Sequence, residues 1–186
     1  MTELSDEIIM RRVRDGNLAE LSVLFERYHV KLYNFMVKLT FDRSVSQDLT
    51  QNLFYRIIKY RHTYKEEHSF RSWVYQLARN VHVDFCKQQR KDTDRYARVE
   101  KYDENITDEK NSFNEEEYER LDHALARLSP GQKEILILSR FQGLKYEEIS
   151  EIQNLSVPAI KVQVHRAIKQ LRQFYFSQHK QDGYEM

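Results

Sequence analysis

The stretch that decides the fold is LSVPAIKVQVHRAIKQL, residues 155–171. Ser156 is placed to cap a helix, and Pro158 then falls in the first turn, where its missing N–H breaks no intrahelical hydrogen bond. Apolar residues follow at helical spacing and predict one buried stripe. The stripe consists of Ile160, Val164, Ile168 and Leu171. We therefore predict a helix over 158–173 with one buried face and one exposed face.

A shorter predicted helix, 146–153, precedes it at the spacing of a helix-turn-helix. Ser150 is a small residue where the two helices approach, and Asn154 tolerates the left-handed backbone of a tight turn. Ile149 and Ile160 are expected to pack together. In a helix-turn-helix, the exposed face of the second helix enters the DNA major groove and meets base edges and phosphates. The candidate contacts are Pro158, Ala159, Lys161, Val162, Gln163, His165, Arg166 and Lys169.

Composition limits the class of protein. Four glycines and two prolines in 186 residues favour an all-helical chain. Cys86 is the only cysteine in the sequence, so an internal disulfide and a cysteine-based zinc site are excluded and a reducing compartment is indicated. Residues 1–16 have the pattern of neither a signal peptide nor a membrane span. We expect a soluble, cytoplasmic protein.

Helical periodicity is strong in the N-terminal half. The expected helices are a run from Leu18 to Leu39 after a capping Asn17, a run from Val45 to Tyr60 after a capping box of Ser44 and Gln47, and a run from Val74 to Phe85 that continues into KQQRK. A polar break separates the last two runs.

The charge is unevenly distributed along the chain. Residues 1–91 carry 16 Lys and Arg against 11 Asp and Glu, and residues 92–120 carry 5 against 11. Residues 121–186 return to a small positive balance. Residues 92–115 also lack a sustained apolar period, which is typical of a flexible linker. The prediction is two small helical domains, 1–91 and 116–178, joined by an acidic linker over 92–115, with a tail over 179–186.

An aromatic and basic series runs through SFRSWVYQLARNVHVDFCKQQRK, residues 69–91. Basic side chains attract the phosphate backbone, and aromatic faces accept unstacked bases. The series consists of Phe70, Arg71, Trp73, Tyr75, Arg79, Lys87, Arg90 and Lys91. Large aromatic residues in a helical domain are usually core residues, so Trp73 and Phe85 also have a purely structural interpretation.

With these segments in order, the chain resembles the bacterial extracytoplasmic-function (ECF) sigma factors of the sigma-70 family. The resemblance is carried by DLTQNLF, SFRSWVYQLARNVHVDF, LSPGQKEILIL and YEEISEIQNLSVPAIKVQVHRAIKQL. It implies that the protein directs RNA polymerase to promoters. The implied partners are core RNA polymerase, at its clamp and flap, and promoter DNA, together with a possible anti-sigma factor. No cofactor is implied.

The resemblance also implies roles for residues. Asp48, Gln51, Asn52 and Phe54 match the helix that contacts the polymerase clamp. Phe70, Arg71, Trp73, Tyr75, Arg79, Asn80 and Lys87 match the part that captures the melted minus-ten strand, with Asn80 near a flipped-base pocket. The helix-turn-helix matches the reader of the minus-thirty-five element. Asn52 stands where the family commonly has an acidic residue, and Gln163 stands where it often has Arg or Lys.

Three other functions are weighed against this one. An enzyme is disfavoured, because the seven histidines show no ligand spacing and the sequence lacks a phosphate-binding glycine loop and a nucleophile elbow. A helix-turn-helix regulator with a sensor or interaction domain remains an alternative, as does a helical scaffold whose basic faces are only solvated. Association with core RNA polymerase distinguishes the scaffold from a sigma factor, and substantial strand content by circular dichroism would favour the regulator.

Overall fold

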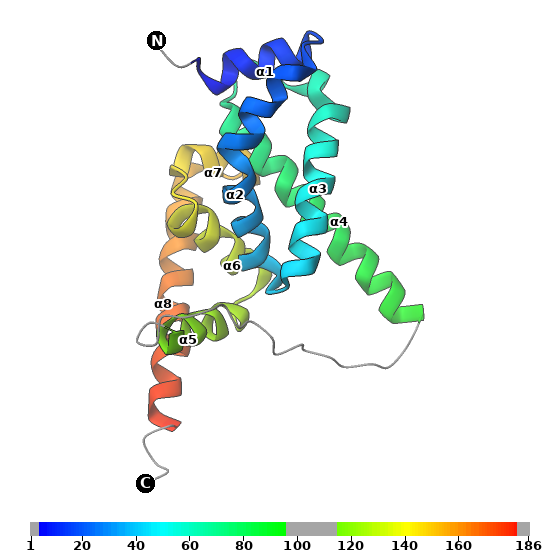
Figure 1. The fold of residues 1–186 in the computed structure, drawn as a ribbon. Coiled ribbons are helices and arrows are strands. Elements are labelled where there is room, and N and C mark those ends of the chain that lie inside the picture. The colour runs from blue at the N-terminus through cyan, green and yellow to red at the C-terminus, as the bar shows by residue number, and fades with distance from the viewer. Residues whose placement is uncertain (1–3, 96–114, 182–186) are drawn as a thin grey trace. The chain divides into compact units, whose positions relative to one another are not determined.

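The computed structural model describes residues 4–95 and 115–181 of the chain, and they fold as two compact units (Figure 1). All regular secondary structure in these residues is helical. The expected all-helical, two-domain architecture is therefore confirmed. Of the expected linker, 92–115, residues 96–114 lie outside the described residues, whereas 92–95 are the end of a helix and Glu115 is the start of another. The expected domain boundaries stay predictions.

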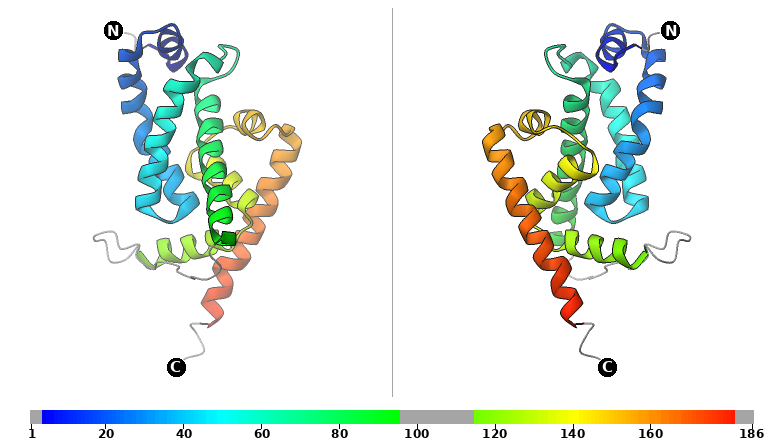
Figure 2. Two further views of the ribbon diagram at one scale, coloured as in Figure 1. Left: turned by 90° about the vertical axis from the view of Figure 1, so that its right-hand side faces the viewer. Right: turned by 90° about the vertical axis from the view of Figure 1, so that its left-hand side faces the viewer.

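The N-terminal unit is built from four α-helices and two short 3-10 helices. They are α1 (Asp6–Arg14), η1 (Leu18–Glu20), α2 (Leu21–Thr40), α3 (Arg43–Tyr60), η2 (Arg61–Thr63) and α4 (Phe70–Arg95). Helices α2, α3 and α4 pack against one another, and α1 lies across one end of them (Figures 1 and 2). The core between them holds Met10, Leu24, Leu32, Phe35, Met36, Leu53, Ile57, Phe70, Val74 and Tyr75, all at most 1% exposed. Burial of this kind stabilises by about 1.5–3 kcal/mol for each large side chain.

Helix α1 was not anticipated from the sequence. Ser5 caps it by accepting a hydrogen bond from the Ile8 N–H, and Ile9, Met10 and Val13 form its buried face. Its nine residues hold only four apolar ones, three of them consecutive, and these are too few to show a clear helical period. The helix forms because α2 and α4 bury that face.

Two of the expected helix caps are wrong. Asn17 makes no capping bond, and its side chain instead donates to Glu20 Oε1. Helix α3 is capped by Asp42, which accepts from the Val45 N–H at 2.8 Å, so Ser44 lies inside the helix. The helix begins after Asp42 because the chain turns at Phe41, which has a left-handed backbone with φ 55°.

The C-terminal unit contains the helix-turn-helix. Its elements are α5 (Glu115–Ala126), α6 (Pro130–Leu136), the π-helical turn η3 (Ile137–Phe141), α7 (Tyr146–Gln153) and α8 (Val157–Gln181). Ser129 and Gln132 form a capping box before Pro130, and Gly143 ends the α6–η3 segment with φ 62°. A capping serine, a proline at the first helical position and a left-handed glycine after the last turn are common at helix ends. The π turn was not anticipated.

Helix α8 is the scaffold of this unit. Helix α7 lies across its N-terminal end, and α5 crosses it nearer the C-terminal end (Figures 1 and 2). The predicted limits of α7 are confirmed, whereas α8 runs eight residues past the predicted end at 173. Its last turns carry the aromatic sequence FYF, residues 174–176, in which Phe174 and Tyr175 are half-buried and Phe176 is exposed. The guanidinium of Arg127, just after α5, lies over the Phe174 ring at 4.4 Å from its centroid.

No helix within the described ranges is long and apolar enough to cross a membrane.

Candidate nucleic-acid and polymerase interface

The exposed face of α8 is formed as the sequence predicts. Ile160, Val164 and Ala167 are buried, and Ile168 and Leu171 are half-buried. On the opposite side Pro158, Lys161, Val162, His165, Arg166 and Lys169 are exposed, with Val162 48% exposed. Ala159 and Gln163 are half-buried and lie at the edges of this face. Five of the eight candidate residues can carry a positive charge or donate a hydrogen bond to DNA.

The start of α8 is held by the turn before it. Asn154 adopts the left-handed conformation with φ 53°, as expected. The Ser150 hydroxyl donates to the carbonyl oxygen of Leu155, and the Ser156 hydroxyl accepts from the Ala159 N–H. Ile149 and Ile160 are both fully buried. The turn is therefore fixed by backbone and side chain together, and the first turn of α8 is presented to solvent.

Two amide bridges fix α8 and α7 on α6. Gln132 Nε2 donates to Gln170 Oε1 at 2.7 Å, and Gln153 Nε2 donates to Glu134 Oε1 at 2.9 Å. Glu134 is a charged residue that is only 8% exposed, so this bond also satisfies part of a buried carboxylate. These contacts orient the helix-turn-helix on a rigid support.

In the N-terminal unit, three of the predicted strand-capture residues meet in one groove of about 410 Å³ between α3 and α4. They are Trp73, Asn80 and Lys87. Trp73 is half-buried, whereas Asn80 and Lys87 are exposed. The groove therefore offers an aromatic face, an amide and a cation side by side.

The remaining predicted residues of this set do not reach the groove. Phe70 and Tyr75 are 1% and 0% exposed, because they fill the core beside Tyr28 and Phe35. Their side chains cannot touch DNA in this arrangement. Arg71 and Arg79 are half-buried and make contacts within the protein. Phe70 and Tyr75 are thus core residues, whereas Trp73 is only partly buried.

The predicted polymerase-docking residues lie on α3. Asp48, Gln51 and Asn52 are exposed and line a second groove of about 720 Å³ with Tyr55. Phe54 does not line it, because its half-buried ring packs against Phe25 with the ring centroids 4.7 Å apart. Phe54 therefore lies apart from the other three predicted docking residues.

Several residues of these grooves were missed from the sequence. Tyr60 was expected on the apolar stripe of α3, yet it is 38% exposed and lines both grooves. Arg56 and Asp84 also line both. The interleaving of basic and aromatic residues used for α4 also occurs in YRIIKYR, residues 55–61, and could have indicated Arg56 and Tyr60.

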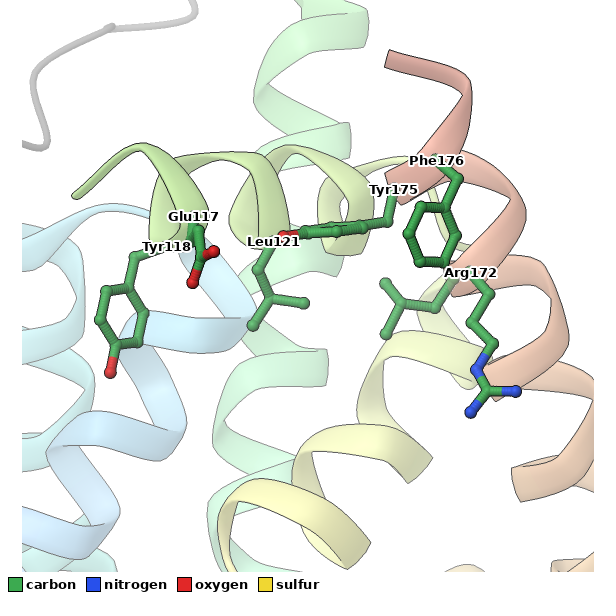
Figure 3. Close-up of a pocket in the computed structure, with 7 residues that line it drawn as sticks. Glu117, Tyr118, Leu121, Arg172, Tyr175 and Phe176 are labelled. Carbon is green, nitrogen blue, oxygen red and sulfur yellow. The ribbon is translucent and has the colours of Figure 1, made fainter. Parts of the chain in front are cut away.

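A third groove, of about 420 Å³, lies between α5 and the end of α8. Figure 3 shows Tyr175 reaching from α8 towards Leu121 of α5, with Tyr118 and Phe176 at its two sides. Tyr118 and Phe176 are 61% and 60% exposed. This apolar surface was not predicted, because it forms only when α5 crosses α8.

Two buried tyrosines of the N-terminal unit have raised pKa values. Burial, together with a hydrogen bond to Asp6, raises the pKa of Tyr28 far above its usual range. Burial raises the pKa of Tyr64 to about 12, and the nearby Glu7 adds to the shift. Both hydroxyls are therefore neutral in the folded unit at any ordinary pH. No group of three or more metal-binding side chains occurs among the residues that the structure describes.

Comparison with known proteins identifies the chain. The sigma-70 region 2 family matches residues 24–92, and the sigma-70 region 4 family matches residues 118–171. The chain belongs to the sigma-70 family, as an ECF sigma factor. The expected family is confirmed. This sigma factor therefore has core RNA polymerase and promoter DNA as its partners, and promoter-directed initiation of transcription as its function.

Relatives of this sigma factor match over most of its length. It is 27% identical over 164 residues to the RNA polymerase sigma factor CarQ of Myxococcus xanthus, a match that covers 88% of this chain and 94% of CarQ. It is 24% identical to the ECF sigma factor SigX of Bacillus subtilis, covering 81% of this chain and 80% of SigX. The ECF sigma factor SigM of Bacillus subtilis is 27% identical, covering 82% of this chain and 93% of SigM.

Two solved structures share the fold. One is CnrH in complex with the cytosolic domain of CnrY, with a TM-score of 0.70 at 20% identity, covering 92% of the sigma factor and 97% of that chain. The other is RpoE in complex with the anti-sigma factor NepR from Bartonella quintana, with a TM-score of 0.72 at 19% identity, covering 83% and 96%. In both, the likeness extends over both units of the sigma factor.

Proposed function

We propose that the sigma factor divides promoter recognition among three surfaces. The exposed face of α8 reads the minus-thirty-five element as duplex, and the α3–α4 groove captures the melted minus-ten strand. The exposed face of α3 docks on the polymerase clamp. The observation that carries this proposal is that the candidate residues are exposed on helices whose opposite faces are buried.

The α8 face supports major-groove reading. Lys161, Arg166 and Lys169 supply cations for phosphates on the exposed side of α8. Val162 offers an apolar contact for a thymine methyl, and the half-buried Gln163 has an amide suited to adenine. With Gln163 in place of Arg or Lys, we expect weaker discrimination for guanine at the base it faces.

The α3–α4 groove supports capture of unstacked bases. Trp73 offers a ring for stacking, Asn80 can hydrogen-bond a base edge, and Lys87 lies where a phosphate could follow. Phe70 and Tyr75 are left out of this surface and act by supporting it from the core. Arg71 and Arg79 do not line the groove and are left out as well.

The exposed face of α3 supports docking on polymerase. Asp48, Gln51 and Asn52 form a polar row along the helix, with Tyr55 as an exposed aromatic next to them. Exposed aromatic residues beside polar groups are common in protein interfaces. Asn52 keeps a hydrogen-bonding role without the charge that is common there in the family.

The mechanism needs no catalytic group in this chain. Unstacking a base costs a few kcal/mol, and stacking on a protein aromatic returns about 1–3 kcal/mol. Binding to the opened strand therefore lowers the free energy of the open promoter. Each unit alone has a modest basic surface, so specificity is expected when polymerase holds both units at the promoter spacing. We accordingly propose a non-enzymatic protein of the cytoplasm.

The α5–α8 groove is proposed as the contact for the polymerase flap. Its aromatic lining and the nearby Arg172 suit an amphipathic helix with an acidic edge. An anti-sigma factor is a further proposed partner, since RpoE was solved in complex with the anti-sigma factor NepR and CnrH in complex with the cytosolic domain of CnrY.

Run-off transcription tests this function. Purified sigma factor and core RNA polymerase are incubated with genomic fragments, and transcripts are mapped at their 5′ ends. We expect defined transcripts that require the sigma factor, with a shared sequence upstream of each start. A sigma factor that co-elutes with core polymerase but starts transcription at no fragment would contradict the proposal.

A further inference from the structure

The first helix of the chain lies outside the recognised part of region 2. Helix α1 spans Asp6–Arg14, whereas the match to the region 2 family begins at residue 24. It nevertheless contacts η2 and α4, which flank the segment 64–70. We propose that α1 is a positioning element, which holds this segment and the adjoining wall of the α3–α4 groove in the arrangement that captures the melted strand. This inference rests on the proposed function of that groove.

Glu66 ties the middle of the segment to α1. Its Oε1 accepts a hydrogen bond from Arg14 Nη2 at 2.9 Å, and its Oε2 lies 3.6 Å from Arg11 Nη1. The two guanidinium groups therefore engage both oxygens of one carboxylate. A carboxylate held on both oxygens has fewer orientations than one in a single ion pair. The loop backbone at Glu66 is restrained accordingly.

Glu7 ties the end of the segment to α1. Its Oε1 accepts from the N–H of Phe70, the first residue of α4, at 3.2 Å. Ser69 Oγ accepts from the Ser72 N–H at 3.0 Å. The first N–H groups of a helix lack intrahelical partners, and a carboxylate there is also favoured by the helix dipole. Helix α4 thus begins at a cap shared between its own sequence and α1.

Helix α1 is itself anchored, so it can serve as a support. Asp6 accepts from the Tyr28 hydroxyl at 2.5 Å and from Arg27 Nη1 at 2.5 Å, which fixes the start of α1 on α2. Met10 and Val13 are fully buried beneath it. Displacing α1 would break these contacts and expose apolar surface.

The segment in turn supports the groove. The ring of Tyr64 lies 5.6 Å from the ring of Trp73 and 6.3 Å from that of Phe70, and Phe70 lies 6.0 Å from Trp73. The Tyr64 hydroxyl donates to the carbonyl oxygen of His68 at 3.1 Å. Trp73 is one of the two aromatic residues that line the groove, together with Tyr60. A shift of the segment is therefore transmitted to the surface proposed for stacking.

Two simpler interpretations predict other outcomes. If the Glu66 ion pairs are merely solvated surface contacts, their removal changes nothing. If Arg14 binds a promoter phosphate directly, its loss is harmful, but loss of the Glu66 charge is neutral or favourable, because an acidic group repels phosphate. Positioning alone predicts that loss of the acidic Glu66 is harmful.

The test uses the complete chain with core RNA polymerase and a promoter found by the run-off experiment. Glu66→Gln, Arg14→Gln and the double variant are compared on duplex promoter and on the same promoter pre-melted at the minus-ten region. We expect each single variant to lower duplex transcription about two- to five-fold, the range of one to two partly exposed ion pairs. The loss should be smaller on pre-melted DNA, where the cost of opening is removed. The double variant should lose no more than the worse single variant, because both residues act through one contact.

Glu20→Gln is the matched control. It removes the same charge and breaks the Arg12–Glu20 ion pair, which also involves α1 and also measures 2.9 Å, but it leaves the segment 64–70 untouched. We expect wild-type transcription from this variant. Thermal melting and core polymerase binding are measured for every variant.

Four results would overturn the inference: full or higher activity of Glu66→Gln, additive losses in the double variant, an equal loss in Glu20→Gln, or equal losses on both templates that follow a lowered melting temperature. A wild-type chain that opens no promoter at all is a different result and would contradict the proposed function instead.

Discussion

Arg56 of α3 donates a hydrogen bond from Nη1 to Asp84 Oδ2 of α4 at 2.7 Å. Its Nε also donates to Asn52 Oδ1 at 3.0 Å. Arg56 and Asp84 line both grooves of the N-terminal unit, so the pair stands between the surface proposed for polymerase and the surface proposed for the melted strand. Asp84 is 52% exposed, and such a pair contributes at most about 1 kcal/mol to stability. We therefore expect the Arg56–Asp84 pair to matter for function more than for stability.

Arg56→Ala is predicted to weaken both core polymerase binding and promoter opening. The substitution frees Asn52 and Asp84 together and removes the cation shared by the two grooves. Asn80→Ala, which changes the strand groove alone, should lower opening and leave core binding unchanged. Core affinity by fluorescence anisotropy and opening by permanganate footprinting distinguish the two effects. Equal core affinities of Arg56→Ala and the wild type would remove Arg56 from the docking surface.

Substituting Lys161 and Arg166 by Ala is predicted to weaken promoter-directed transcription while core binding stays intact. Each lost phosphate contact lowers the slope of log affinity against log salt by about 1. Both residues are exposed, so stability should change by less than about 0.5 kcal/mol. Transcription across a salt series provides the measurement.

Arg140→Ala is the control for that experiment, because Arg140 is an exposed cation on η3 and lies outside α8. Its salt slope should equal that of the wild type. An unchanged transcript level in the Lys161 and Arg166 variant would contradict the assignment of the α8 face.

Asp48→Ala and Phe54→Ala are predicted to behave differently although both residues belong to α3. Asp48 is exposed, so its loss should lower core affinity without changing the melting temperature. Phe54 is half-buried against Phe25, so its loss should cost about 1–3 kcal/mol of stability. Thermal melts beside a core-binding titration measure both. A stable Phe54→Ala variant with lost core affinity would assign Phe54 to docking instead.

The N-terminal unit is predicted to lose stability in alkali. The pKa of Tyr64 is about 12 in the folded unit and about 10 in an unfolded chain, and the Tyr28 pKa is raised further. Between those values the folded state retains protons that the unfolded state has lost. The stabilising contribution is therefore complete below pH about 10 and falls as pH rises towards the folded pKa.

Melting temperatures between pH 8 and 11.5 measure this loss. Tyr64→Phe should reduce its slope, because phenylalanine cannot ionise. It should also lower the melting temperature at pH 8, since the bond from the Tyr64 hydroxyl to His68 is removed. A melting temperature independent of pH over that range would contradict the burial of these hydroxyls.

Phe176→Ser is predicted to weaken the contact between the C-terminal unit and the polymerase flap. The ring is 60% exposed at the edge of the α5–α8 groove, so its loss should leave the fold intact. Transcription from promoters that depend on the minus-thirty-five element should fall. Binding of DNA by the exposed face of α8 should stay unchanged. Unchanged transcription would exclude Phe176 from the flap contact.

Local rules read from the sequence determined the helix-turn-helix. The limits of α7, the left-handed Asn154 and the capping box at Ser129 all follow from side-chain chemistry that acts within a few residues. The exposed face of α8 followed as well, because a single periodic stripe specifies which side is buried. The family resemblance depended on the same short segments.

The N-terminal unit shows where such rules end. Helix α1 has too few apolar positions to be recognised alone, and the shared cap at Phe70 joins residues 63 positions apart. Phe70 and Tyr75 carry the same residue types as a base-stacking surface, yet they are core, whereas Trp73 reaches the groove.

The sequence by itself thus determined the helical class, the helix-turn-helix and the family, because those depend on contacts between near neighbours along the chain. The tertiary structure alone decided which aromatic rings face solvent, which arginine stands between the two grooves, and that the first helix holds the segment before α4. Each of these depends on how separate helices cross, and crossing is set by packing between residues that are distant in the chain.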